Sequence, residues 1–201
     1  MKNTTELANL YHQQYLESGN DYWESRGFNE QTIARFKLGL VVSPKTVDSV
    51  YFKGSPTIPY LTPDGYAYQI RVRSPKDGGP KYLPLVREHP GESKVHLFNA
   101  RDSLESGVYI TEGEIDCITL VQLGYPAVGV PGVSSWRSHW RYLLEDSEPT
   151  LILDPDEAGN QGREFIKRDL NCTEIHLEDL DLNDLLVHRG PESIHKLLGG
   201  K

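Results

Sequence analysis

The stretch that decides the fold is Val108-Tyr109-Ile110-Thr111-Glu112-Gly113-Glu114-Ile115-Asp116. Its apolar start predicts a buried strand, and Glu112 stands where that strand ends. A second stretch, Thr150-Leu151-Ile152-Leu153-Asp154-Pro155-Asp156, ends another buried strand with two carboxylates. These two carboxylates are expected to point the same way because alternate residues of an extended segment share a side.

Carboxylates at strand ends have a natural chemical role. In open α/β sheets, ligands bind outside the carboxyl ends of the strands. Carboxylates that converge there hold hard divalent cations such as Mg²⁺ against phosphate oxygens. The two stretches therefore indicate phosphodiester chemistry.

Strand and helix patterns alternate throughout the second half of the chain. We expect strands over residues 108–111, 127–130, 150–153 and 174–177. We expect helices over residues 114–124, 135–145, 159–170 and 184–198, the last of them interrupted near Gly190-Pro191. Repeated βα units of this length imply a parallel sheet with right-handed crossovers. The second half is therefore predicted to be an α/β domain.

The first half has a different pattern. Residues 4–18, 21–27 and 29–36 are predicted to be short helices, the third capped by Asn29. Two strands follow around a Pro-Asp-Gly turn, and in the second of them Arg71 and Arg73 share one face. We therefore expect an α+β subdomain over residues 1–104 and the α/β domain over residues 105–201.

The composition narrows the class of protein. A net charge of -8 argues against a protein that grips nucleic acid over its whole surface. Basic residues outnumber acidic ones from Lys45 to Arg101, and acids concentrate from Glu105 onward, which fits either a polynucleotide enzyme or an unevenly charged surface. The cysteines, Cys117 and Cys172, form no CxxC pair, so we expect no zinc ribbon or disulfide framework and interpret both as buried small side chains.

The chain carries no sign of a membrane segment. No apolar run approaches the roughly 18–20 residues that span a bilayer. The N-terminal residues lack the apolar core of a signal peptide. We therefore expect a cytoplasmic protein without a membrane partner.

A third acidic cluster, Asp179-Leu180-Asp181-Leu182-Asn183-Asp184, follows the fourth expected strand. Taken alone, it is typical of a capping turn, because Asp and Asn are favoured at helix starts. The other clusters have the same alternative, since Glu112 and Glu114 favour a helix N-terminus and Asp156 is placed to cap the next helix. Three acidic clusters at three strand ends together nevertheless indicate a convergent site.

One further segment, Trp136-Arg137-Ser138-His139-Trp140-Arg141, mixes aromatic and basic residues. Such residues can stack on nucleic-acid bases. At helical spacing, however, Trp136, Trp140 and Leu143 are more typical of a packing face. We interpret them as core residues.

The three acidic segments together resemble the TOPRIM domain, which bacterial-type primases, topoisomerases and some nucleases share. That domain carries a Glu-Gly after its first strand and an Asp-x-Asp after its third, and residues 108–186 cover it here. The form Ile110-Thr111-Glu112-Gly113-Glu114-Ile115-Asp116 looks like phage primase-helicases and bacterial-type primases more than topoisomerases. The run from Asp154 to Gly159 is similar to the Asp-x-Asp-x-Ala-Gly segment of the family, and the run from Asp181 to Leu186 to its closing acidic segment.

The first half adds to this resemblance. Residues 22–40 are similar to the opening of the primase polymerase core, and the Arg-bearing strand and Lys81-Tyr82-Leu83 follow in the order of that core. In the family, these segments line the groove for template and nucleotide. The resemblance therefore implies that Arg71, Arg73 and Lys81 bind nucleic acid or nucleotide.

The resemblance also implies a fold and an activity. The fold is a TOPRIM parallel-sheet (Rossmann-like) domain preceded by a smaller α+β primase subdomain. The activity is that of a DNA primase, a DNA-directed RNA polymerase that makes short RNA primers on single-stranded DNA from ribonucleoside triphosphates.

Site residues follow from the same resemblance. Glu112 is expected to transfer a proton or to position a metal, and Asp116 to support the metal ligands or catalysis. In the third cluster, Asp184 is expected to be a ligand ahead of Asp181. The acids that would hold Mg²⁺ or Mn²⁺ are Glu112, Asp154, Asp156, Asp181 and Asp184.

The resemblance leaves partners and alternatives to consider. We expect no zinc-binding domain before the core and no helicase domain after it, so a replicative helicase or a separate zinc-domain protein is an expected partner. A phage-encoded protein of this kind would work in the host cytoplasm. The alternatives are a TOPRIM nuclease, which would use the same metals to cleave, and a non-catalytic replication adaptor that binds nucleic acid.

Overall fold

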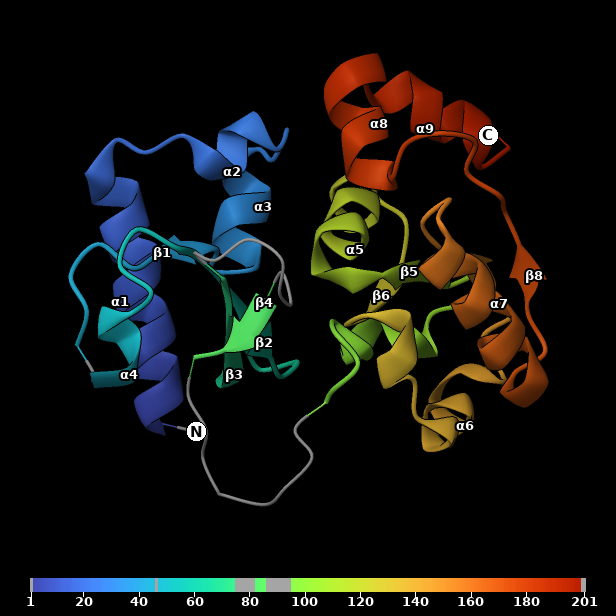
Figure 1. Ribbon diagram of the computed structural model, residues 1–201, viewed down its shortest axis with the longest axis horizontal. Coiled ribbons are helices and arrows are strands. Elements are labelled where there is room, and N and C mark those ends of the chain that lie inside the picture. The colour runs from blue at the N-terminus through green and yellow to red at the C-terminus, as the bar shows by residue number, and fades with distance from the viewer. Residues whose placement is uncertain (1, 46, 75–81, 86–94, 200–201) are drawn as a thin grey trace. The chain divides into compact units, whose positions relative to one another are not determined.

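The structure is a computed structural model that describes residues 2–45, 47–74, 82–85 and 95–199 (Figure 1). The chain divides into two compact units, Met1–Ser93 and Lys94–Lys201. Each unit has its own sheet. Among the described residues, no helix is long and apolar enough to cross a membrane.

The first unit is α+β, as expected. Its sheet is antiparallel, with the strand order β1-β2-β3-β4. The described elements are α1 (Lys2–Ser18), α2 (Tyr22–Ser25), α3 (Glu30–Arg35), β1 (Gly39–Leu40), α4 (Val47–Val50), β2 (Pro56–Leu61), β3 (Ala67–Arg73) and β4 (Tyr82–Pro84). The predicted cap of α3 is confirmed, because the Asn29 side chain accepts a hydrogen bond from the Thr32 backbone N–H at 2.9 Å.

The core of this unit lies between α1 and the sheet. Leu7, Ala8 and Tyr11 come from α1, and they cluster with Ile70 and Val72 of β3. Because side chains alternate along a strand, burial of Ile70 and Val72 leaves the intervening arginines on the opposite face of β3. Both arginines are partly exposed there.

The second unit is an α/β domain whose four strands pair in parallel, which confirms the predicted fold class. Its strand order is β6-β5-β7-β8. The described elements are η1 (Ala100–Leu104), β5 (Tyr109–Glu112), α5 (Gly113–Gln122), β6 (Ala127–Val130), η2 (Val133–Ser135), η3 (Ser138–Trp140), α6 (Arg141–Leu144), β7 (Thr150–Ile152), α7 (Glu157–Asp169), β8 (Thr173–Glu174), α8 (Leu182–Arg189) and α9 (Pro191–Leu197).

The strand order creates a switch point between β5 and β7. The connection from β5 leads outward to β6 through α5, and the connection from β7 leads outward to β8 through α7. Right-handed crossovers in opposite directions place the two helices on opposite faces of the sheet. Ligands of open α/β sheets bind in the crevice that such a reversal leaves at the carboxyl ends of the strands.

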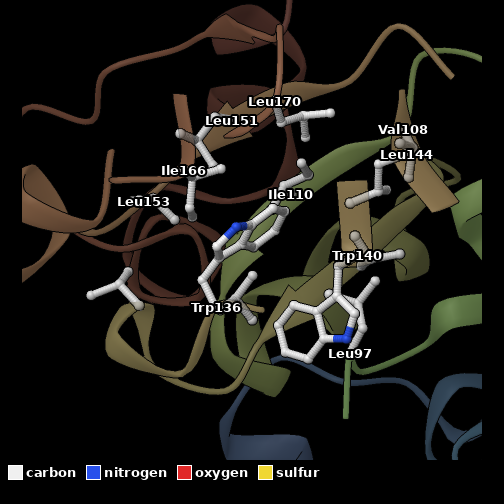
Figure 2. Packing of buried hydrophobic residues seen from close by; sticks show 13 residues of the cluster. Leu97, Val108, Ile110, Trp136, Trp140, Leu144, Leu151, Leu153, Ile166 and Leu170 are labelled. Atoms are coloured by element: carbon white, nitrogen blue, oxygen red, sulfur yellow. The ribbon is translucent and has the colours of Figure 1, made fainter. Parts of the chain in front are cut away.

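One large hydrophobic cluster fills the face of the sheet that α7 covers (Figure 2). Trp136 and Trp140 are almost completely buried in it, with Ile166 of α7, so their interpretation as core residues is confirmed. The prediction that Leu143 belongs to the same packing face was wrong. Leu143 is 43% exposed, and its neighbour Leu144 is the buried residue.

The helix expected over residues 135–145 is largely absent. Two 3-10 turns, η2 and η3, precede a single α-helical turn, α6. The indole N–H of Trp136 donates to the Asp169 carboxylate at 2.9 Å, and its ring meets that of Trp140 edge to face. Packing of the two indoles, rather than regular helical periodicity, therefore shapes this segment.

The boundary between the units lies earlier than expected. Residues 95–104 belong to the second unit, whereas a boundary at residues 104 and 105 would leave them in the first. Leu97 is part of the second core, and Phe98 exchanges two backbone hydrogen bonds with Gly129 of β6, at 2.8 and 3.1 Å. These bonds attach the segment to the parallel sheet.

The two cysteines lie in this unit. Cys117 is fully buried, as expected, and its thiol donates to the Ala127 carbonyl at 3.2 Å. Cys172 is only partly buried and packs at the margin of the core. Both are free thiols.

Candidate functional site

The first acidic segment is a tight turn from β5 into α5. Glu112 is the last residue of β5 and the N-cap of α5, and Gly113 follows with a φ of 81°. A side chain at position 113 would be strained in this left-handed conformation, so the turn favours glycine. A second glycine, Gly129 of β6, admits this turn, because a Cβ there would lie 2.3 Å from the Gly113 carbonyl oxygen. The turn therefore fixes Glu112 at the end of the central strand.

The second acidic segment joins β7 to α7. Asp156 caps α7, since its Oδ1 accepts the Gly159 backbone N–H at 2.7 Å. Gly159 lies directly against the end of the strand, where a Cβ would approach the Asp154 carbonyl oxygen to 2.1 Å. The first turn of α7 thus packs on the backbone that carries Asp154. The Asp154 carboxylate is partly buried, and that of Asp156 is exposed.

The third acidic segment begins α8. Asp181 is the N-cap, and its Oδ1 accepts the Asp184 backbone N–H at 2.7 Å. The capping alternative is therefore confirmed for both Asp156 and Asp181. Each cap uses one of the two carboxylate oxygens, so capping is compatible with metal binding through the other.

Asp116 is the residue around which these segments converge. Its side chain is 5% exposed and lies on the first turn of α5. Burial, followed by the neighbouring charges of Asp181 and Asp154, raises the pKa of Asp116 well above its ordinary value, although the Asn183 backbone N–H opposes this by donating to Asp116 Oδ1 at 3.0 Å. Asp116 also shares a hydrogen bond with the Asp154 side chain. Acids from all three segments therefore lie within electrostatic reach of one another, although β8 ends at Glu174 and Asp181 stands at the start of α8 rather than at a strand end.

This arrangement fits a hard divalent cation by its chemistry. The donors are carboxylate oxygens, which Mg²⁺ and Mn²⁺ prefer. Crowded carboxylates repel one another unless a proton or a cation neutralises them, and after burial the charges of Asp181 and Asp154 are what raise the pKa of Asp116. Among the residues that the structure describes, no three His, Cys, Asp or Glu side chains already form a metal-ligand group.

The predicted basic residues belong to the first unit. Arg71 donates from Nη2 to the Tyr82 carbonyl at 2.8 Å. Arg73 pairs with Tyr82 in the β3–β4 register. The Tyr82 carbonyl thus orients the Arg71 guanidinium group. Lys81 lies outside the described residues.

Sequence reasoning missed one polar residue at the site. Asn183 is completely buried, and its amide donates to Thr119 Oγ1 of α5 at 3.0 Å. An Asn inside an acidic capping segment looks like another capping residue, so no sequence signal distinguished it. Its partner lies 64 positions earlier in the chain.

Comparisons with known proteins agree with this geometry. A family model described as "Toprim-like" matches residues 109–186, from the start of β5 into α8. The Gene 57 protein of Mycobacterium phage D29 is 34% identical over 152 residues, which cover 71% of this chain and 97% of the phage protein. A DNA primase of Chlamydia trachomatis is 24% identical over 229 aligned positions, which cover 94% of this chain and 38% of the primase.

Solved structures show the same fold over nearly the whole chain. A DnaG primase catalytic domain, solved bound to single-stranded DNA, superposes with a TM-score of 0.74 at 20% identity. The match covers 98% of this chain and 79% of that domain. The chain spans only about two fifths of the Chlamydia primase, so it corresponds to a part of that protein. The residues that the Toprim-like model matches include all three acidic segments, and the chain belongs to the TOPRIM family and has the fold of the bacterial-type primase catalytic core.

Proposed function

We propose that this protein is a primase-type nucleotidyltransferase that joins ribonucleotides into short RNA primers on single-stranded DNA. The observation that carries the proposal is the convergence of the three acidic segments around Asp116, at the switch point of a primase-core fold. The Chlamydia relative is named a DNA primase, and the DnaG domain was solved with single-stranded DNA, which supports the same substrate class here.

The acids have distinct proposed roles. Asp154 and Asp181 flank the buried Asp116, so we place Asp181 ahead of Asp184 as a ligand. When bound, Mg²⁺ or Mn²⁺ would neutralise triphosphate oxygens and the charge that develops in phosphoryl transfer. The residues proposed to hold the metal ions are Glu112, Asp154, Asp156, Asp181 and Asp184.

Glu112 is the proposed proton acceptor. It is partly exposed at the end of the central strand, at the N-terminus of α5. Asp116 is too buried to meet a substrate directly and would instead support its neighbour Asp154 through their shared hydrogen bond. Carboxylates oriented in this way are general bases when they lie within hydrogen-bond reach of the proton to be removed.

The basic residues would bind the polyanions. Arg71 and Arg73 lie on one face of β3, and the Tyr82 carbonyl orients the Arg71 guanidinium group. Charge-assisted hydrogen bonds from such guanidinium groups to phosphate are strong and salt-dependent. Lys81 is proposed for the same task from its position in the sequence.

Primer synthesis provides the test. Purified protein would be incubated with single-stranded DNA, labelled ribonucleoside triphosphates and Mg²⁺ or Mn²⁺. We expect labelled oligoribonucleotides from the wild type and none from Asp154→Ala. Asp179→Ala is the matched control, since Asp179 lies in the third acidic segment but is exposed and pairs with Arg189 at 2.6 Å.

The other outcomes identify the alternatives. Cleavage of DNA or RNA that depends on Asp154 would show a TOPRIM nuclease instead. Neither synthesis nor cleavage, with retained binding of nucleic acid, would show an adaptor. Repeating the assay with a replicative helicase or a zinc-domain protein tests the proposed partners, and the proposed site of action is the host cytoplasm, where the nucleotides are.

A further inference from the structure

The start of α8 is attached to α5 by hydrogen bonds that are completely buried. α8 lies against α5 in the second unit (Figure 1). Thr119 of α5 and Asn183 of α8 are both inaccessible to solvent, and Asp116, one turn before Thr119, is nearly so. Buried polar groups must be paired, because an unpaired one costs about 1–3 kcal/mol. The two helices must therefore pack so that these buried polar groups keep their hydrogen bonds.

Asn183 contacts α5 in two ways. Its backbone N–H donates to Asp116 Oδ1 at 3.0 Å, and its side-chain amide donates to Thr119 Oγ1 at 3.0 Å. The Thr119 hydroxyl donates its own proton to the Ile115 carbonyl at 3.0 Å, so its oxygen accepts from Asn183. The two bonds from Asn183 reach positions three residues apart on α5, which fixes both the distance and the rotation of α8.

This attachment fixes the acids as well. Asp181 precedes Asn183 by two residues, and its cap bond to the Asp184 N–H makes the first turn of α8 one rigid piece. The N–H of Asn183 binds the Asp116 carboxylate, so the same bond brings the segment that carries Asp181 to Asp116. Buried leucines of α8, such as Leu182 and Leu186, attach the helix through contacts that have no preferred direction. The directional bonds of Asn183 therefore fix the position of Asp181 relative to α5.

We propose that Asn183 is a positioning residue that acts through Thr119 to hold the Asp181 carboxylate beside those of Asp116 and Asp154, and thereby sets the affinity of the site for a divalent cation. The inference rests on the proposed function, since it assumes that these acids bind metal. It assigns the Asn of the third segment to the support of the ligands rather than to the ligand set.

Binding of Mn²⁺ alone, measured on the full chain, tests the inference. The six-line paramagnetic resonance signal of free Mn²⁺ disappears on binding and reports affinity without any enzymatic activity. We expect Asn183→Ala to weaken Mn²⁺ binding about 10-fold, the typical scale for loss of a residue that orients metal ligands. Thr119→Val should weaken it similarly, whereas Thr119→Ser keeps the hydroxyl group and should bind like the wild type.

A matched control separates positioning from general destabilisation. Asn99 is a buried Asn of the same unit whose amide donates to the Ala127 carbonyl at 2.8 Å, at the start of β6 and away from the acids. Because its φ is 52°, Asn99→Gly removes the side-chain bond without backbone strain. Asn99→Gly should lower the unfolding temperature measured in EDTA but leave Mn²⁺ affinity within twofold of the wild type.

Each outcome decides between the two proposals. Wild-type affinity in Asn183→Ala or in Thr119→Val, with the wild type binding Mn²⁺, would overturn the positioning role and leave the metal site intact. Equal weakening in Asn99→Gly would also overturn it, because the effect would then be general. Absence of Mn²⁺ binding by the wild type would overturn the metal site itself and the positioning role with it. In the double variant, the effects of Asn183→Ala and Thr119→Val should not add, since both remove the same bond.

Discussion

Replacing Gly159 with Ala should separate α7 from the end of β7 and disturb the Asp154 carboxylate. A Cβ at position 159 would lie 2.1 Å from the Asp154 carbonyl oxygen, and that separation would have to grow to at least 3.0 Å. The obstacle is backbone, so no change of rotamer relieves it. The shift also strains the 2.7 Å cap bond from the Gly159 N–H to Asp156.

The expected cost follows from opposing contributions. In an open helix, Gly→Ala stabilises by about 1 kcal/mol. Overpacking costs about 1–3 kcal/mol, and a strained N-cap costs up to about 1 kcal/mol. Because the clash is with backbone, we place the overpacking at the upper end of its range. The net expectation is a loss of about 2 kcal/mol of unfolding free energy.

Urea unfolding followed by tryptophan fluorescence measures this loss, because Trp136 and Trp140 report on the core that α7 covers. The matched control is Gly162→Ala, where the added Cβ would meet the Val133 side chain at 2.3 Å. That clash is with the Cβ, Cγ1 and Cγ2 atoms of Val133, so Val133→Gly, which removes all three, should relieve it in Gly162→Ala but not the backbone clash in Gly159→Ala. Stability of Gly159→Ala equal to or above that of the wild type would refute the proposed packing of α7 on the strand end.

Two further predictions concern single side chains. In metal-free buffer, Asp116→Asn should be more stable than the wild type at neutral pH. Burial and neighbouring acids raise the folded-state pKa of Asp116, so its carboxyl stabilises the fold below the ordinary value of 3.8 and loses this contribution as pH rises. The advantage of the variant in urea unfolding should therefore grow from pH 4 to pH 8, and a constant difference would contradict the raised pKa. Asn29→Ala should cost the first unit about 1 kcal/mol by removing the α3 cap, whereas Asn29→Asp, measured by the same unfolding curves, should stay near the wild type.

The sequence predicts much of the fold because its local signals agree with the tertiary structure. Glu112 and Asp154 stand at strand ends in the structure as in the pattern, because an apolar run that stops at a carboxylate marks where a buried strand reaches solvent. The N-cap at Asn29 could also be predicted from the sequence, because the capping bond joins residues only three positions apart. Short-range rules suffice where the partner is close in sequence.

The rest depends on partners that are distant in the chain. Asp116 reads as an ordinary acidic residue in a first helical turn, and its burial follows only from α8 packing over α5. The Asn183–Thr119 bond likewise joins residues 64 positions apart. Around Trp136, an indole bond to Asp169 of α7 replaced the expected helix with 3-10 turns. Tertiary packing outweighs local propensity in such segments.

The same acidic residues serve both as helix N-caps and as candidate metal ligands, although the sequence alone presents these two roles as alternatives. Glu112, Asp156 and Asp181 are the N-cap residues of α5, α7 and α8, so the N-termini of three helices point at the acidic site. Each N-terminus carries a partial positive charge of about +0.5. That charge offsets part of the repulsion among the carboxylates and lets the protein hold them together before any cation arrives. It does not cancel the effects of burial and of the neighbouring acids, because Asp116 keeps a raised pKa despite the N–H that Asn183 donates to it. The helix ends therefore organise the acids and leave them under-neutralised, which is the state that a divalent cation and a triphosphate would complete.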